Sequence, residues 1–324
     1  MEVQLDERFM ALGAALAASS QDTGRSEHRL ASATRQRLSG FADHDVVKWL
    51  WEQVRKYEFL TLAMQLEQLG GPPDFAPRPS SEAPPFVDEY FSMIPRDKVS
   101  QGLAVWWRVA EIAELLRSQR PQWEVALQDV VSVLGQVNLE EFQVRFFGRF
   151  PYRAIIVPVV NVPFVGAQAV GVSTNSETRA ICFPYGDSTY GEHPFDLMVV
   201  AQHEASHVMV DLVQRLHPAV TGECLFVEEA CPPSGRFLSG YGDPGFRFVE
   251  TLIRASSYFF LQWLGMESEA ESFLGSQLAA GVSGIGAFVR ALRPWWNLRV
   301  EAKAAGLDAY FPRIPSELRR AVSA

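Results

Sequence analysis

The sequence predicts an α+β protein that is mostly helical and carries one small mixed sheet. Apolar residues recur at spacings of three and four through residues 2–69 and again through residues 86–147, as in amphipathic helices. Residues 153–185 instead form short β-branched runs separated by Pro, Gly and Asn, which indicates strands. The helical texture returns from residue 194 onward. We therefore expect helical N- and C-terminal parts around a small sheet.

The N-terminal region is predicted to hold three helices. Their apolar residues keep the helical spacing within residues 5–16, 30–41 and 46–69. His28 and His44 lie near the starts of the second and third helices, where capping side chains belong. We therefore interpret both histidines as caps and not as members of a functional site.

A linker is expected after these helices. Residues 70–85, GGPPDFAPRPSSEAPP, have no periodicity and contain many breakers. They divide the chain into an N-terminal helical region, 1–85, and a second region, 86–324, unless they form a long surface crossing inside one domain. Further helices are predicted at the start of the second region, over residues 101–118, 123–135 and 139–147.

Three strands are predicted between residues 153 and 185. The runs at residues 154–164, 167–174 and 178–185 are short and rich in β-branched residues. Pro158 and Pro163 restrict the first run to an edge or a bulge, because proline has no N–H to donate. An edge strand beside the following helix has unpaired backbone groups, which can hold an extended peptide by strand addition.

A helix over residues 194–215 carries the most specific motif of the chain. His193 directly precedes its first proline, so it is expected to be extended and outside the site. His203, Glu204 and His207 form the pattern H-E-x-x-H in an apolar run. Residues four apart share a helical face, so both imidazoles can reach one metal ion with Glu204 beside them. Without a metal, this helix would bury a carboxylate and two imidazoles at a cost that needs a partner.

A catalytic zinc ion needs three protein ligands and a position for water, so a third ligand is required. The variant HExxHxxGxxH is excluded, because its glycine and last histidine would fall on Val210 and Val213. The chain instead resembles the gluzincin type of zincin metallopeptidase, in which a strand precedes the HExxH helix and a later helix supplies a glutamate. The nearest likeness is to an uncharacterised bacterial domain-of-unknown-function family suspected of zinc metalloprotease activity. The segments that carry the likeness are HEASHVMVD, residues 203–211, and VETLIRA, residues 249–255.

The resemblance implies a zinc ion held by His203, His207 and Glu250, with Glu250 on a helix over residues 246–264. It also implies a zincin-like core in which the sheet lies next to the HExxH helix. An ion pair with Arg254, one turn further along, is the alternative role for Glu250. Three other acidic residues compete for the position of third ligand, namely Glu228, Glu229 and Asp243.

The resemblance further implies a mechanism. Zinc lowers the pKa of its bound water to about 7, and Glu204 takes the proton as general base. Tyr241 and Arg254 are the candidate donors to the oxyanion. Gluzincins often carry an aspartate at the position of Arg254, where it orients the first histidine. Asp211, one turn after His207, is a candidate substitute for that aspartate, but we favour its interpretation as a solvated helix residue.

We therefore expect a zinc-dependent hydrolase, a metallopeptidase that cleaves peptide bonds in a peptide or protein substrate. The alternative is a catalytically silent zincin fold that serves as a binding or assembly module. The intact motif favours the enzyme, because a silent module tends to lose Glu204, which is not a metal ligand. A purely helical scaffold without metal is a third interpretation, and the zinc content of the purified protein separates it from the first two.

Composition and charge exclude several classes of partner. The chain has 324 residues, of which 48% are hydrophobic and 21% charged, and a formal net charge of -9. These values suit a soluble protein with a large core and argue against nucleic acid as a partner. Acidic residues precede the first apolar run, so we expect this run to be the first amphipathic helix and not a signal peptide. No run approaches the roughly 20 apolar residues of a membrane span. A cytoplasmic location is slightly favoured over export, and the oligomeric state stays open.

The three cysteines, Cys182, Cys224 and Cys231, cannot all pair and form no C-x-x-C arrangement. We interpret them as buried thiols. A disulfide between Cys224 and Cys231 is the alternative in an exported protein.

Overall fold

The computed structural model describes residues 1–19, 28–79, 94–164, 166–173, 178–185, 194–301 and 303–323. The protein is 69% helical and has one small mixed sheet of four strands, which confirms the predicted fold class at this level. The chain forms two compact units. Unit 1 contains Met1–Gln136 and Pro151–Ala201, and unit 2 contains Val137–Phe150 and Gln202–Ala324. The boundary predicted at residue 85 falls inside unit 1, and residues 80–93 lie outside the described part of the chain.

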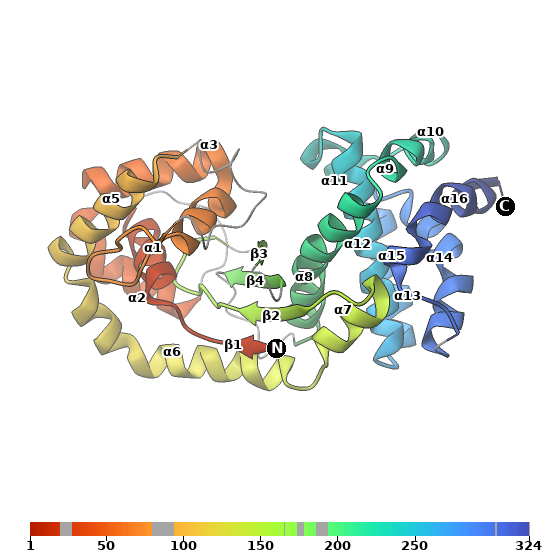
Figure 1. Ribbon diagram of the computed structural model, residues 1–324. Helices are drawn as coiled ribbons and strands as arrows, with labels where there is room; N and C mark the ends of the chain where they lie inside the picture. The colour runs from red at the N-terminus through yellow and green to blue at the C-terminus, as the bar shows by residue number, and fades with distance from the viewer. Residues whose placement is uncertain are drawn as a thin grey trace. The chain divides into compact units, whose positions relative to one another are not determined.

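The helices of unit 1 include the three that the N-terminal sequence predicts. They are α1 (Glu7–Ala18), α2 (Arg29–Leu38) with the short η1 (Ser39–Phe41), α3 (Asp45–Glu67), α5 (Arg96–Val109) and α6 (Ile112–Leu134) (Figure 1). The side chains of His28 and His44 accept hydrogen bonds from the second backbone N–H of α2 and α3, at 3.1 and 3.3 Å. Their interpretation as N-terminal caps is confirmed, and both histidines therefore have a structural role.

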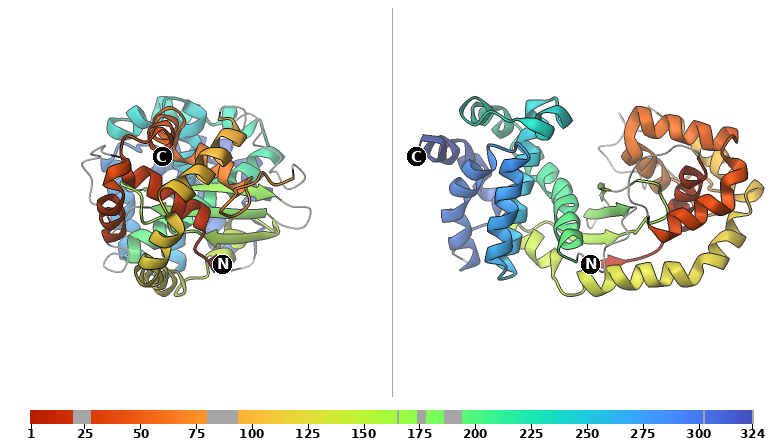
Figure 2. Two further views of the ribbon diagram at one scale, coloured as in Figure 1. Left: turned by 90° about the vertical axis from the view of Figure 1, so that its left-hand side faces the viewer. Right: turned by 180° about the vertical axis from the view of Figure 1, so that it is seen from behind.

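The predicted helix over residues 101–118 is wrong in its bounds. α5 ends at Val109, and Glu111 takes a left-handed backbone conformation with φ of 49°. α6 then runs without interruption through Pro121, as Figure 2 shows from behind for the long yellow helix. Glutamate seldom adopts positive φ, so the sequence carries no signal for this break. The predicted separation of the helices over residues 101–118 and 123–135 is therefore wrong, because α6 spans the residues between them.

The sheet belongs to unit 1 and has the strand order β1-β2-β4-β3. Its strands are β1 (Glu2–Val3), β2 (Tyr152–Ile156), β3 (Gly166–Ser173) and β4 (Thr178–Tyr185). β2 is parallel to both β1 and β4, whereas β3 is antiparallel to β4. The sheet is therefore mixed, as predicted, and residue 174 at the end of the second predicted run lies outside the described residues.

The predicted edge position of the first run is wrong. β2 is an inner strand, because β1 pairs with it at Ile155 and Ile156. The strand ends before Pro158, and the prolines lie in the segment that follows. Val157 and Val159 still donate backbone hydrogen bonds to β4, at 2.8 and 2.9 Å, so the missing N–H of Pro158 falls between two donors. The edges of the described sheet are β1 and β3.

Unit 2 is a set of helices around an aromatic core. Its longer helices are α7 (Leu139–Phe147), α8 (Pro194–Leu216, within unit 2 from Gln202), α12 (Pro244–Trp263), α13 (Glu267–Ala279), α14 (Ile285–Val300) and α16 (Ile314–Ser323). Short helices join them, namely α9 (Val220–Glu223), α10 (Phe226–Ala230), α11 (Gly235–Gly240), α15 (Leu307–Tyr310) and η3 (Phe311–Arg313). Phe146 packs against Phe259, Trp295 and Trp296 in the core, with ring centroids 5.2 to 5.9 Å apart. These contacts hold α7, α12 and α14 together.

The cysteines and the helix lengths bear on two further expectations. All three cysteines are free, and Cys182 and Cys224 are buried, whereas Cys231 is partly exposed. Burial raises the pKa of the Cys224 thiol to about 12, as for an unreactive thiol. Among the described residues, no helix has both the length and the apolar character that crossing a bilayer requires.

Candidate metal centre

The two histidines of the motif face one another on α8. The helix begins at Pro194, has Asp196 in its first turn and is apolar along much of its length, which favours a buried helix. His203 and His207 are one turn apart, and their Nε2 atoms lie 3.3 Å from each other. Their side chains are 16% and 33% exposed, so both rings are accessible from one side.

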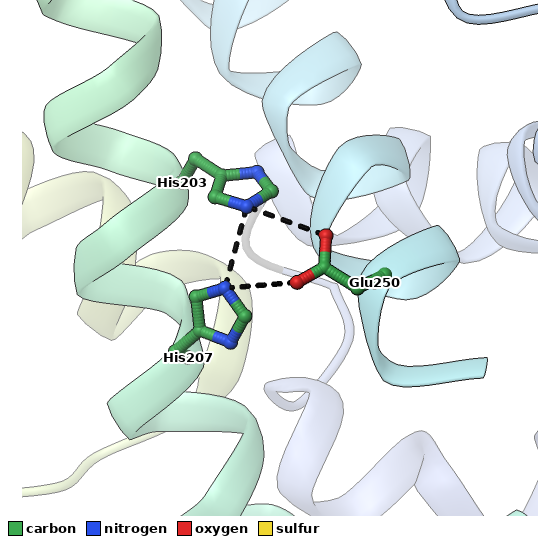
Figure 3. A group of neighbouring side chains, drawn as sticks. All are labelled: His203, His207 and Glu250. Carbon is green, nitrogen blue, oxygen red and sulfur yellow. Dashed lines mark hydrogen bonds and ion pairs between the residues drawn. The ribbon is translucent and has the colours of Figure 1, made fainter. Parts of the chain in front are cut away.

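Glu250 on α12 completes a group of three ligand atoms, as Figure 3 shows. Its Oε2 atom lies 3.5 Å from Nε2 of His203, and its Oε1 atom lies 3.3 Å from Nε2 of His207. Its side chain is 8% exposed. It is the one group of three or more such residues within metal-binding distance among the described residues.

The spacing of these atoms fits a zinc ion. Ligands at about 2.1 Å from zinc in a tetrahedral arrangement lie about 3.4 Å from one another. The two Nε2 atoms are 3.3 Å apart, and each has a Glu250 oxygen at a similar distance, namely Oε2 at 3.5 Å from His203 and Oε1 at 3.3 Å from His207. The three side chains therefore converge at separations close to that edge length, with a different oxygen of Glu250 nearest to each histidine. Two imidazoles and a carboxylate are also a donor set that zinc prefers at catalytic sites, with the fourth position open.

None of the three rival ligands lies at the histidines, and two of them have other partners. Both carboxylate oxygens of Glu228 accept hydrogen bonds from Arg247, at 2.6 and 2.7 Å. Asp243 caps the N-terminus of α12 by accepting from the backbone N–H of Phe246 at 3.0 Å. Glu229 is exposed on α10. The structure therefore brings Glu250, and none of these three, to the histidines.

The alternative role predicted for Glu250 is also present. Nη2 of Arg254 donates to Oε2 of Glu250 at 3.0 Å, one turn along α12. The same guanidinium donates to Oε1 of Gln277 at 2.9 Å and to the hydroxyl of Tyr241 at 3.4 Å. It also lies over the ring of Phe237, 5.6 Å from its centroid. Oε2 faces both Arg254 and His203, and Oε1 faces His207, so the ion pair and the candidate ligand position coexist.

Burial and neighbouring charges set the protonation of the three ligands. Burial, assisted by His207, lowers the pKa of His203 to about 3, so this ring is neutral and can bind a metal. Burial opposes the ionised form of Glu250, but the hydrogen bond from His207 and the charges of His203, His207 and Arg254 outweigh it and lower its pKa to about 2. Burial likewise opposes the charged form of His207, and Glu250 and Glu204 reverse the effect and raise its pKa.

Glu204 lies between the two histidines in the sequence and is not one of the three ligands. Burial raises the pKa of Glu204 to about 7, against a smaller lowering by His207. Within the described residues, its carboxylate has no hydrogen-bond or ion-pair partner. A carboxylate with a pKa near neutrality can both accept and return a proton under ordinary conditions.

Two further expectations have different outcomes. Asp211 is 46% exposed and forms an ion pair with Arg215 at 2.9 Å, as expected for a solvated helix residue and not for the aspartate that orients a histidine. His193 lies outside the described residues. Sequence reasoning missed Gln277 and Arg247, which hold Arg254 and the backbone of Tyr241. The sequence does contain a signal for Arg247, because it is a cation three residues before Glu250 in an apolar run. It contains none for Gln277 on α13.

No protein-family model, curated protein or solved structure matches the chain. The chemistry of this site is therefore argued from its geometry.

Proposed function

We propose that the protein is a zinc-dependent hydrolase, a metallopeptidase of the gluzincin type with a zincin-like core. The observation that carries the proposal is the convergence of His203 and His207 with Glu250, whose oxygens lie 3.5 and 3.3 Å from the two Nε2 atoms. Glu250 lies on another helix, 43 residues after His207 in the sequence. Arg254 pairs with Oε2 of Glu250. A metal ion would in addition join Oε1 and the two imidazoles, which are costly to bury together without such a partner. Burial raises the pKa of Glu204, which is adjacent to His203 in the sequence, to about 7. A carboxylate of this kind supports hydrolysis, and not storage of the metal, as the function of the site.

The residues of the chain divide the work of peptide hydrolysis. A zinc ion, when bound by His203, His207 and Glu250, acidifies water and polarises a carbonyl group. Glu204 accepts the proton of the attacking water, so that the oxygen can bond to the scissile carbonyl carbon. As the C–N bond breaks, Glu204 returns that proton to the leaving amine nitrogen.

Tyr241 is the better of the two candidate donors to the oxyanion. Burial raises the pKa of its hydroxyl, so it keeps its proton at neutral pH. Its backbone carbonyl accepts a hydrogen bond from Arg247 at 2.6 Å, and its ring packs against Phe237 with centroids 5.2 Å apart. The guanidinium of Arg254 is instead committed to Glu250 and Gln277. We therefore assign the donor role to Tyr241 and a charge-balancing role to Arg254.

The test compares two variants at the motif. Glu204→Gln is expected to retain about one zinc per chain and to lose hydrolysis of a peptide mixture by at least about a hundredfold, because it removes the general base. His203→Ala is expected to lose both zinc and activity. Elemental analysis and release of new amino groups from the peptides are the two measurements. Glu229→Gln, at an exposed acidic position, is the matched control and is expected to change neither.

Each outcome separates the hypotheses. Full activity in Glu204→Gln would remove the general-base role. Zinc in the unaltered protein with no hydrolysis of any peptide would favour the silent binding module. Absence of zinc from the unaltered protein would overturn the metal centre.

A further inference from the structure

A buried network of uncharged polar side chains lies between α7, α8 and α12 in unit 2. Its members are Gln143 on α7, Gln202 and Ser206 on α8, and Ser256 and Ser257 on α12. All five residues are fully buried. No charged residue belongs to the network, and neither the motif nor the mechanism uses it.

Gln202 is the centre of the network. Its Nε2 atom donates to the hydroxyls of Ser206 and Ser256, at 2.7 and 2.9 Å. Its Oε1 atom accepts from the hydroxyl of Ser257 at 2.5 Å. Nε2 of Gln143 donates to the backbone oxygen of Gln202 and to the hydroxyl of Ser206, at 3.2 and 3.1 Å. None of the five residues leaves a buried side-chain atom without a partner.

Such a network favours one arrangement of the helices over all others. A buried amide or hydroxyl is costly when it loses its hydrogen bonds, whereas apolar side chains tolerate small shifts. A slide of α12 by one residue moves it about 1.5 Å along its axis. Such a slide would break the hydrogen bonds between Gln202 and the two serines of α12, Ser256 and Ser257. The network therefore fixes the rotation and the axial position of α12 relative to α8.

The fixed arrangement is the one on which the metal ligands depend. Gln202 and Ser206 each directly precede a histidine of the motif, and Ser256 lies six residues after Glu250. Each histidine Nε2 has one oxygen of Glu250 within 3.5 Å, so a slide of α12 by about 1.5 Å would move the carboxylate away from the place where the two imidazoles converge.

We infer that Gln202, with Ser206, Ser256, Ser257 and Gln143, is a positioning network that sets the zinc affinity of the site by fixing α12 against α8. The inference rests on the proposed zinc centre. It assigns a role to five residues that touch neither metal nor substrate.

The experiment pairs each variant with a control in unit 1. Gln202→Leu removes the central amide, and Ser257→Ala removes one hydroxyl with little change in volume. Unit 1 offers a similar buried pair, in which Nε2 of Gln119 donates to the hydroxyl of Thr34 at 3.1 Å. Gln119→Leu and Thr34→Val therefore remove the same groups far along the chain from the metal ligands.

Zinc affinity and thermal stability are measured together, by competition with a chelator and by the unfolding midpoint. We expect Gln202→Leu to weaken zinc binding about 10- to 100-fold and Ser257→Ala to weaken it about tenfold, as for residues that orient metal ligands. The controls are expected to lower the unfolding midpoint comparably and to leave zinc affinity unchanged. The visible spectrum of the Co2+-loaded protein, which reports ligand geometry, is expected to change in the first pair alone.

The outcomes distinguish this inference from the proposed function. Zinc affinity that is unchanged in a folded Ser257→Ala or Gln202→Leu variant would overturn the inference alone. Equal losses of zinc affinity in the control variants would also overturn it, because the effect would then be one of general stability. A failure of the unaltered protein to bind zinc would overturn the proposed centre and this inference with it.

Discussion

Two glutamates of unit 2 each pair with an arginine of α12, and they have different surroundings. Glu228 presents both oxygens to Arg247, whose guanidinium also donates to the backbone oxygens of Tyr241 and Gly242. Oε2 of Glu250 accepts a hydrogen bond from Arg254 and also faces His203, and Oε1 faces His207. The first carboxylate is saturated by a planar fork of donors, and the second is not.

The difference separates a structural carboxylate from a candidate ligand. A carboxylate that is held by two parallel N–H groups has little capacity left for a metal, and its arginine ties α10 and the residues before α12 to the start of α12. Oε1 of Glu250 faces His207 and accepts no hydrogen bond from Arg254, so it is available to the proposed metal ion, while Arg254 balances the charge through Oε2. Substitution of Glu250 should therefore lower zinc affinity, whereas substitution of Glu228 should lower stability and leave zinc affinity largely unchanged.

The largest effect is expected for Glu250→Ala. Removal of one of three ligands should weaken zinc binding by more than about a hundredfold, which exceeds the loss typical of residues outside the ligand set. Zinc affinity is measured by competition with a chelator of known affinity. Unchanged zinc affinity here, with a loss in a Glu228→Ala or Glu229→Ala variant, would move the ligand and reverse the comparison.

The second effect is a loss of stability without a loss of metal. Glu228→Ala leaves the guanidinium of Arg247, which is 9% exposed, without its anion. We expect a destabilisation of about 2 kcal/mol, which is less than for a fully buried pair because the Glu228 side chain is 24% exposed. Chemical denaturation of the zinc-free protein measures it. A fall in zinc affinity larger than that of Glu250→Ala would show that the two carboxylates were assigned in the wrong order.

The third effect concerns the charge balance at Glu250. In Arg254→Met, the metal-free protein loses the cation that offsets this carboxylate, whereas a bound zinc ion supplies one. We expect zinc to bind more tightly in the variant by about 1 kcal/mol, or about fivefold. Zinc titration of both proteins at one ionic strength checks the direction. Weaker binding would mean that Arg254 orients Glu250, and a fall in kcat at unchanged affinity would restore Arg254 as the oxyanion donor.

Local patterns predicted the features that depend on neighbouring residues. His203 and His207 share a helical face because they are four apart, and His28 and His44 precede helices as caps do. Each of these signals lies within one or two turns of chain. The expectation of a gluzincin-type site pointed to Glu250, because spacing alone left the third ligand open among four acidic residues.

Features that join distant segments had no such signal. β1 pairs with β2 across about 150 residues, and this pairing made β2 an inner strand in spite of its prolines. The left-handed Glu111 broke a helix where no glycine marks the break. The network around Gln202 joins three helices through residues that are common in any sequence. Packing between distant segments determines these features, and local sequence preferences do not predict them.

The smallest change in stability and zinc affinity is expected for Asp211, the candidate substitute for an orienting aspartate. Asp211 pairs with Arg215 one turn along α8, and their side chains are 46% and 43% exposed. An exposed pair of this kind contributes about 0.5 kcal/mol or less, because solvent screens both charges. Asp211→Asn should therefore change the free energy of unfolding by no more than this and leave zinc affinity unaltered. A tenfold loss of zinc affinity would show that Asp211 turns from Arg215 to a histidine when metal binds, since orienting carboxylates have effects of that size.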